Sequence, residues 1–309
     1  MSHSGPDKST GARPLRVRVP ATTANLGPGY DLIGAALNLY NQFDFAPADD
    51  YSLQLAGPLA AECKFGLTPD SLIRRAFELV YREVGLSAPS FALRQDIDVP
   101  PSRGLGSSST AIVAALLAAN QWLDSALGQA DLLRLATQLE GHPDNVAPAL
   151  LGGCILNFPG GGWTRLPVPE SLYWIVCIPD FELETIKARG VVPERVSRDD
   201  AVCNMAYLGA LVAGFCLKDS SLIKQGLQDT LHQPFRQALV PGMPDVLLAA
   251  TDAGALGAVL SGAGPTLLAL SEQFPAQVGE AMVRAWAGYG IAARFVTCII
   301  DLHGAVCLD

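Results

Sequence analysis

Pro100-Pro-Ser-Arg-Gly-Leu-Gly-Ser-Ser-Ser-Thr110 runs directly into the apolar stretch Ala111-Ile-Val-Ala-Ala-Leu-Leu-Ala-Ala119. Two glycines, then four consecutive hydroxyl residues and an apolar run without glycine or proline, predict a loop that becomes a buried helix. Gly104 and Gly106 can adopt backbone conformations closed to other residues, and they have no Cβ to hold a ligand away from the main chain. Because the first N–H groups of a helix have no internal partner, the segment is either a helix start capped by one of its serines or a seat for phosphate.

This loop matches neither of the two commoner nucleotide-binding patterns. A Walker-type loop ends in Gly-Lys-Ser/Thr, but serine follows Gly106 here, and a dinucleotide fingerprint has a third glycine where this chain has Ser109. Without a lysine, the charge of a bound phosphate would be neutralised by backbone N–H groups, the helix dipole and Mg²⁺. Serine hydroxyls can join the oxygen shell of such an ion.

Glu140 is the carboxylate that best fits this ion. It lies at the end of a predicted helix and directly before a glycine, so its side chain is presented beside a loop. Glu140, His142, Asp144 and Asn145 fall within six residues, in a segment otherwise poor in charge. The alternative interpretation is a solvated acid at a helix end.

Length and composition narrow the class of protein. The 309 residues suffice for two domains, and 50% hydrophobic with 17% charged residues argues against disorder over most of the chain. A net charge of −9 argues against a nucleic-acid partner. Seven scattered cysteines without a Cys-x-x-Cys pair indicate reduced thiols. No run approaches the ~18 apolar residues of a membrane span, and the N-terminus lacks the apolar centre of a secretory signal, so we expect a cytoplasmic protein without a membrane partner.

Hydrophobic spacing predicts an α+β layout of mixed strands and helices. We expect strands over 15–20, 37–45, 51–55, 91–99, 150–157, 173–178, 258–261, 266–270 and 293–301. We expect helices over 71–84, 107–123, 129–140, 244–253 and 276–287, with helical material from about 197 to 229. The glycine run 159–162 is the predicted boundary, which gives a disordered tail 1–14 and two domains, 15–162 and 163–309.

Three motifs give the chain a resemblance to the GHMP small-molecule kinases. They are Pro20-Ala-Thr-Thr-Ala-Asn-Leu-Gly-Pro-Gly-Tyr-Asp31, the loop Pro100–Thr110, and Leu260-Ser-Gly-Ala-Gly-Pro-Thr266. Further segments are similar to the homoserine kinase family, namely Glu140-Gly-His-Pro-Asp-Asn-Val-Ala-Pro148, Thr185-x-x-x-Arg189 and His232-Gln-Pro-Phe-Arg236. The resemblance extends from about Arg16 to Asp301.

The resemblance implies the two-domain GHMP fold, with an N-terminal ribosomal-S5-like α/β domain and a C-terminal ferredoxin-like α+β domain. It also implies transfer of the ATP γ-phosphoryl group, with Mg²⁺, to the side-chain hydroxyl of L-homoserine, a step of threonine biosynthesis, in a homodimer. The alternatives are a related kinase for mevalonate, a sugar or a diphosphocytidyl alcohol, and a non-catalytic nucleotide-binding or amino-acid-binding relative.

The resemblance also assigns roles to residues. The nucleotide site would comprise Pro100, Arg103, Gly104, Leu105, Gly106, Ser107, Ser108, Ser109 and Thr110. The amino-acid pocket would comprise Asn25, Asp31, His142, Asp144, Thr185, Arg189 and Arg236. Ser107 and Glu140 would bind the metal, and together with Asp31, the nearest candidate for a base, they are the expected catalytic set.

Other interpretations of these residues stay open. Arg189 and Arg236 could form surface salt bridges, and Asp31 could cap a helix that starts near Leu32. Gly262 to Gly264 could be a tight turn between strands that lies near the site. Relatives often carry an asparagine near the adenine where this chain has 70–76, so selectivity for the nucleotide base is open.

Overall fold

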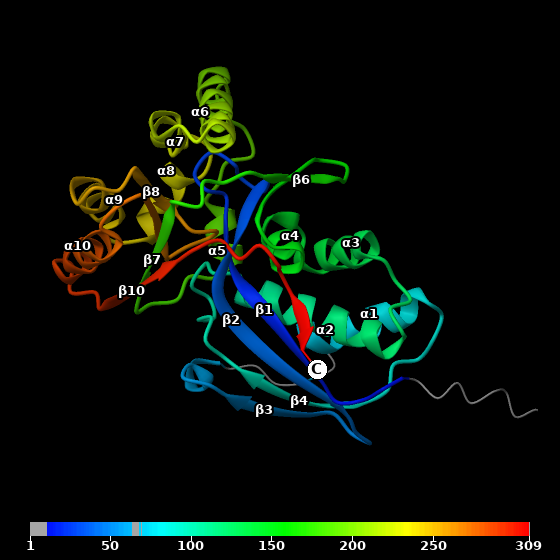
Figure 1. Cartoon of the computed structure of the whole chain (residues 1–309). Coiled ribbons are helices and arrows are strands. Elements are labelled where there is room, and N and C mark those ends of the chain that lie inside the picture. The colour runs from blue at the N-terminus through cyan, green and yellow to red at the C-terminus, as the bar shows by residue number, and fades with distance from the viewer. Residues whose placement is uncertain (1–10, 64–67, 69, 309) are drawn as a thin grey trace, which may run out of the picture.

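The computed structural model describes residues 11–63, 68 and 70–308 (Figure 1). Residues 11–14 form neither helix nor strand, and the first ten residues of the predicted tail lie outside the described residues. The described strands form two sheets, each covered by helices. The predicted α+β class is confirmed.

The larger sheet has the strand order β11-β1-β2-β4-β3, with β5 paired to β2 and β6 paired to β5. Its strands are β1 (Leu15–Ala24), β2 (Ile33–Pro47), β3 (Ser52–Ala56), β4 (Phe91–Asp96), β5 (Cys154–Asn157), β6 (Trp163–Leu166) and β11 (Val306–Leu308). Alternation in β1 and β2 buries Val17, Val19, Phe43 and Phe45. The register shifts at Pro20, where proline has no N–H for the ladder.

Helices cover one face of this sheet: α1 (Leu72–Glu83), α2 (Ser107–Trp122), α3 (Gln129–Glu140) and α4 (Pro143–Leu151) (Figure 1). Helix α2 is buried along most of its length, as its apolar sequence predicts, and it packs against α1, α3 and α4. The core here includes Phe77, Phe91 and Trp122.

The second sheet has the order β10-β7-β9-β8 and is antiparallel throughout. Its strands are β7 (Tyr173–Pro179), β8 (Gly257–Leu260), β9 (Leu267–Ser271) and β10 (Ala293–Cys298). One face packs on α9 (Met243–Asp252) and α10 (Pro275–Ala287), and the other on α6 (Arg198–Leu217) and α7 (Ser220–Gly226). The core on the second face also contains Ala21 and Ile33, so it joins the two sheets.

Short helices complete the described chain and carry residues of the site. They are α5 (Thr185–Gly190), α8 (Gln233–Arg236), and the 3-10 turns Ala60–Glu62 and Gln237–Leu239. The two strands β6 and β11 follow residue 162 but belong to the larger sheet. The predicted boundary after residue 162 therefore does not follow the division of strands between the sheets.

Three local expectations are wrong. The segment after Glu140 is a helix, α4, so the strand expected from residue 150 begins only at Cys154. Asp31 caps no helix, because Ile33 begins strand β2. The third is the expectation that no run approaches the length of a membrane span. Helix α6 contains 17 consecutive residues without a charged side chain and, by length and composition only, is long and apolar enough to cross a membrane. In the fold its inner face packs on the second sheet through Leu211 and Phe215.

Candidate active site

A cavity of about 160 Å³ brings together residues from all three sequence motifs and from α5 and α8. Of the residues predicted for the nucleotide, metal and amino acid, those that line it are Asn25, Arg103, Gly104, Gly106, Ser107, Ser108, Glu140, His142, Asp144, Thr185, Arg189 and Arg236. Those that do not are Asp31, Pro100, Leu105, Ser109 and Thr110. The lining also includes Pro101, Ser102, Asn145, Gly262 and Ala263, which lie in the quoted segments but were not among the predicted site residues.

The glycine-rich loop is shaped by close packing. Gly106, at φ 67°, is the N-cap of α2, and a Cβ there would lie 1.9 Å from the Thr22 hydroxyl oxygen. At Gly104, where φ is 73°, a Cβ would lie 2.3 Å from the carbonyl oxygen of Ser261. No side chain caps α2, so the predicted serine cap is wrong. The N-terminus of α2 therefore opens toward the cavity without a protein oxygen in the capping position.

The loop serines instead face Glu140. This residue ends α3, and Gly141 turns the chain away in the left-handed conformation at φ 91°. Its Oε1 accepts hydrogen bonds from the hydroxyls of Ser108 (2.9 Å) and Ser109 (3.2 Å). The hydroxyl of Ser107 donates instead to the carbonyl of Val99 at 3.3 Å. An all-oxygen set of one carboxylate and several hydroxyls, beside a helix N-terminus, fits Mg²⁺ bound together with phosphates.

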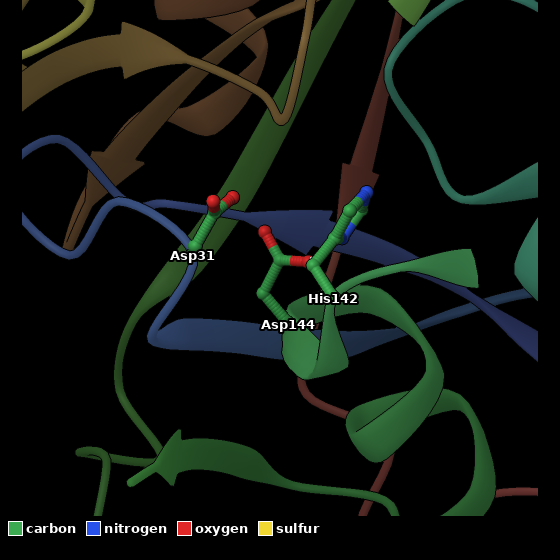
Figure 2. Close-up of side chains that lie close together, drawn as sticks. All are labelled: Asp31, His142 and Asp144. Carbon is green, nitrogen blue, oxygen red and sulfur yellow. The ribbon is translucent and has the colours of Figure 1, made fainter. Parts of the chain in front are cut away.

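Asp31, His142 and Asp144 form a compact cluster (Figure 2), and two of its members, His142 and Asp144, line the cavity. One ligand atom from each lies within 4.8 Å of the others. His142 Nδ1 is hydrogen-bonded to the buried carboxylate of Asp144. Burial lowers the pKa of His142, but the hydrogen bond and charge of Asp144 outweigh it, so the net shift is upward. The imidazole is thus favoured in its charged form.

Arg189, on α5, forms a two-point ion pair with Asp31, at 3.0 Å and 2.5 Å. Burial opposes its charge, but the hydrogen bond and charge of Asp31 raise the pKa of Arg189. About a third of each side chain is exposed, at 34% and 32%. The Asp31 carboxylate is therefore engaged by a cation in this structure, which makes it a weak candidate for a free base.

Arg236, on α8, is different because it is 1% exposed and forms no ion pair with a described carboxylate. Its Nε donates to the Ala188 carbonyl at 3.0 Å, and Nη1 donates to the Gly262 carbonyl at 3.1 Å. Nη1 also contacts His232 Nδ1 at 3.2 Å. Burial lowers the pKa of Arg236. A buried guanidinium held by neutral groups at a cavity wall is arranged to receive an anion.

The comparisons with known proteins agree with this geometry. The sequence matches the descriptions "GHMP kinases N terminal domain" over residues 71–153 and "GHMP kinases C terminal" over 211–288. It is 45% identical over 295 residues to a homoserine kinase of Nostoc punctiforme, across 94% of this chain and 97% of that protein. A homoserine kinase of Trichormus variabilis is 46% identical, across 94% and 98%. The chain belongs to the homoserine kinase family.

Solved structures confirm the fold of this homoserine kinase family member. The crystal structure of homoserine kinase from Cytophaga hutchinsonii matches with a TM-score of 0.88 and 29% identity, covering 100% of both chains. A mevalonate kinase from Methanococcus jannaschii matches with a TM-score of 0.69 at 13% identity, across 96% of this chain and 99% of that one, which shows the shared fold alone. The predicted two-domain GHMP fold is confirmed.

Two residues near the site were missed at the level of sequence. Asn145 follows Asp144 on α4, lines the cavity, and accepts a hydrogen bond from the Thr22 hydroxyl at 2.8 Å. It lies inside the quoted segment Glu140–Pro148, so its polar side chain could have been assigned to the site from the sequence. Tyr30 precedes Asp31, and its ring lies 5.6 Å from the Arg189 guanidinium and 5.3 Å from that of Arg236. Only the fold reveals that contact, because these residues are far apart in sequence.

Proposed function

We propose that this protein transfers the γ-phosphoryl group of ATP to the side-chain hydroxyl of L-homoserine, giving O-phospho-L-homoserine for threonine biosynthesis. Identity near 45% to curated homoserine kinases over nearly the whole chain supports it. The observation that carries it in this structure is the buried Arg236 at the wall of a cavity that also holds the glycine-rich loop and Glu140.

The acceptor follows from the charges at the cavity. A zwitterionic amino acid needs a cation for its carboxylate and an anion for its ammonium. Arg236 offers a buried cation at the cavity wall, and the carboxylates of Asp31 and Asp144 lie close to each other. Asn25, His142, Thr185 and Arg189 complete the proposed pocket. Mevalonate has no ammonium and a neutral sugar has neither group, so both fit this set less well.

The nucleotide would lie along the loop Pro100–Thr110, with its phosphates at the N-terminus of α2. Mg²⁺, held by Glu140 with Ser107 or Ser108, would neutralise charge on the transferring group. The loop amides and the α2 dipole would align the phosphates with the acceptor hydroxyl, and phosphoryl transfer depends chiefly on such positioning and charge neutralisation. Asp31 is the best candidate among the site residues to accept the hydroxyl proton, but it would first have to leave Arg189.

The remaining assignments are proposals of the same kind. The segment 15–162 would bind ATP, and 163–309 would complete the substrate site through α5 and α8. The protein would act in the cytoplasm as a homodimer, with small molecules and neither nucleic acid nor membrane as partners.

The test is an assay of ADP release with ATP and Mg²⁺ against homoserine, mevalonate and galactose. We expect turnover with homoserine alone, and a product whose phosphorus NMR signal and mass match O-phosphohomoserine. Turnover with mevalonate or galactose in its place would assign another kinase of the superfamily. ATP binding without turnover on any acceptor would favour a non-catalytic relative.

A further inference from the structure

His232 is a buried residue of the segment His232-Gln-Pro-Phe-Arg236 to which the proposed function gives no role. It is 0% exposed and directly precedes helix α8, one helical turn before Arg236. Its Nε2 lies 2.8 Å from the carbonyl oxygen of Gly27, and because a carbonyl only accepts, Nε2 carries the proton. The other ring nitrogen, Nδ1, is then an acceptor, and it lies 3.2 Å from Nη1 of Arg236, which only donates.

The contact with His232 decides which N–H groups of Arg236 remain for a ligand. A guanidinium has five N–H groups. The one on Nε donates to the Ala188 carbonyl, and the two on Nη1 donate to the Gly262 carbonyl and to His232 Nδ1. Nη2 has no hydrogen-bond partner among the residues that the structure describes, and Arg236 lines the cavity. The two N–H groups of Nη2 are therefore what Arg236 offers to a ligand.

We propose that His232 is a positioning residue: its neutral ring, with the proton on Nε2, accepts a hydrogen bond from Arg236 Nη1 and so turns Nη2 toward the carboxylate of the substrate. The proposal rests on the proposed function, in which Arg236 receives that carboxylate. His232 is not part of the cavity lining, so it acts through the arginine and not on the substrate.

The surroundings of His232 keep its ring fixed and neutral. Asp229, whose side chain is 0% exposed, accepts through Oδ2 the backbone N–H groups of His232 at 3.0 Å and Gln233 at 2.6 Å. The ring of Tyr30 lies 5.2 Å from the imidazole. Burial lowers the pKa of His232; the charge of Asp229 opposes this and the charge of Arg236 adds to it, so the net shift is downward. The neutral imidazole is favoured, as an acceptor toward Arg236 must be.

Two substitutions separate the roles of the two ring nitrogens. His232→Asn places its amide oxygen where the ring has Nδ1, so it keeps an acceptor for Arg236 and loses the contact with Gly27. His232→Gln places its amide near the position of Nε2, so it keeps that contact and loses the acceptor. His303→Gln is the control, because His303 is exposed between β10 and β11 and does not line the cavity. Urea denaturation supplies the stability of each variant.

The first experiment measures homoserine binding by titration calorimetry, and kcat and KM by ADP release with homoserine and with 3-aminopropan-1-ol, which lacks the carboxylate. We expect His232→Gln to weaken homoserine binding and raise its KM about 10-fold or more, as loss of one hydrogen bond to a charged group does. Its kcat at saturating homoserine should stay within about threefold of wild type, and so should its kcat/KM for 3-aminopropan-1-ol. His232→Asn and His303→Gln should bind homoserine within about threefold of wild type. An equal loss on both acceptors, or an equal loss in the Asn and Gln variants, would overturn the proposal.

The second experiment reads the tautomer of His232 in the wild type, so it does not depend on how well a variant folds. The chain has four histidines, and long-range proton–nitrogen NMR spectra distinguish the two nitrogens of each ring. We expect His232 to carry a proton on Nε2 and none on Nδ1. A proton on Nδ1 would overturn the proposal whatever the kinetics show.

The outcomes also separate this proposal from the kinase assignment. Homoserine binding without turnover in the wild type would contradict the proposed function, and the binding comparison of the His232 variants would still decide the role of His232. Turnover with the same KM in wild type and His232→Gln would contradict the role of His232 and leave the proposed function standing. A wild type that does not bind homoserine would contradict both.

Discussion

Replacing Arg236 with methionine separates stability from substrate recognition. The guanidinium is 1% exposed and held by two backbone carbonyls and His232, with no described carboxylate paired to it. Arg236→Met loses three polar contacts, each worth about 1 kcal/mol net. It also removes a desolvated cation, whose burial costs several kcal/mol when unpaired. These effects oppose each other, so the free energy of unfolding should stay within about 2 kcal/mol of wild type.

The effect of Arg236→Met on substrate recognition is not offset in this way. Truncating one partner of a buried charge pair costs about 2–5 kcal/mol, which corresponds to about 30- to 5,000-fold in affinity. If Arg236 receives the substrate carboxylate, kcat/KM for homoserine should fall about 150-fold, from a central cost of about 3 kcal/mol. Binding of ATP should be little changed, because the loop Pro100–Thr110 does not contain this residue.

The assay compares homoserine with 3-aminopropan-1-ol, which is homoserine without its carboxylate, on the wild type and on Arg236→Met. The wild type should prefer homoserine by about the factor that the mutation removes, and the variant should treat the two acceptors nearly alike. This is a mutant cycle in which the substrate carboxylate is the second partner. An equal loss on both acceptors would refute the reasoning, because the arginine would then act through structure alone. Chemical denaturation supplies the stability of each protein.

Three further predictions concern the metal carboxylate, a close contact and a titrating pair. Glu140→Gln keeps an oxygen for the two serine hydroxyls but removes the negative charge, so kcat with ATP and Mg²⁺ should fall about 100- to 1,000-fold. Near-normal turnover would contradict the assignment of Glu140 to the metal site. Gly34→Ala places a Cβ 1.6 Å from the Asp144 carbonyl oxygen and should lower the free energy of unfolding by about 3 kcal/mol. Gly128→Ala, whose Cβ would meet only Asp131 Oδ2 at an ordinary contact distance of 3.8 Å, should change it by less than about 1 kcal/mol in urea denaturation. The raised pKa of His142 means that its pair with Asp144 contributes stability fully below pH ~6.5 and loses it as pH rises through the raised value. His142→Gln should therefore flatten the fall of stability above that pH, and an unchanged pH profile would show that the pair contributes nothing.

The sequence predicted regular elements well where their hydrophobic spacing was clear. The predicted helices 107–123 and 129–140 appear as Ser107–Trp122 and Gln129–Glu140. Helix α4 was missed because Pro148 lies inside it, and a proline in a helix interior is normally a breaker. Pro148 has no N–H to donate to the Asp144 carbonyl. Gly34 of β2 packs against that same carbonyl, and α4 is thereby placed against the sheet by a tertiary contact that no local pattern reveals.

The sequence predicted which residues come together around the cavity better than it predicted which of them pair with one another. Sequence similarity placed Asp31 and Arg189 in one pocket but could not show that they form an ion pair with each other while Arg236 has no described carboxylate. Which charges compensate one another depends on distances of a few ångströms between α5, α8 and the turn before β2. Such distances are set by packing of the two sheets and are not encoded in the spacing of either segment.

The fold also explains why the three motifs occur together. The three motifs are far apart in the sequence, yet they hydrogen-bond directly to one another: Asn25 Nδ2 donates to the Gly262 carbonyl at 2.9 Å, and the Ser261 hydroxyl donates to the Gly104 carbonyl at 2.6 Å. Backbone bonds from Thr22 to Leu105 and from Thr266 to Arg103 join the same strands and loop. Gly104 is therefore required by its neighbour Ser261 even before any phosphate binds. The glycine-rich loop owes its shape to the other two motifs, so it can present its amides to a phosphate without reorganising when the ligand arrives.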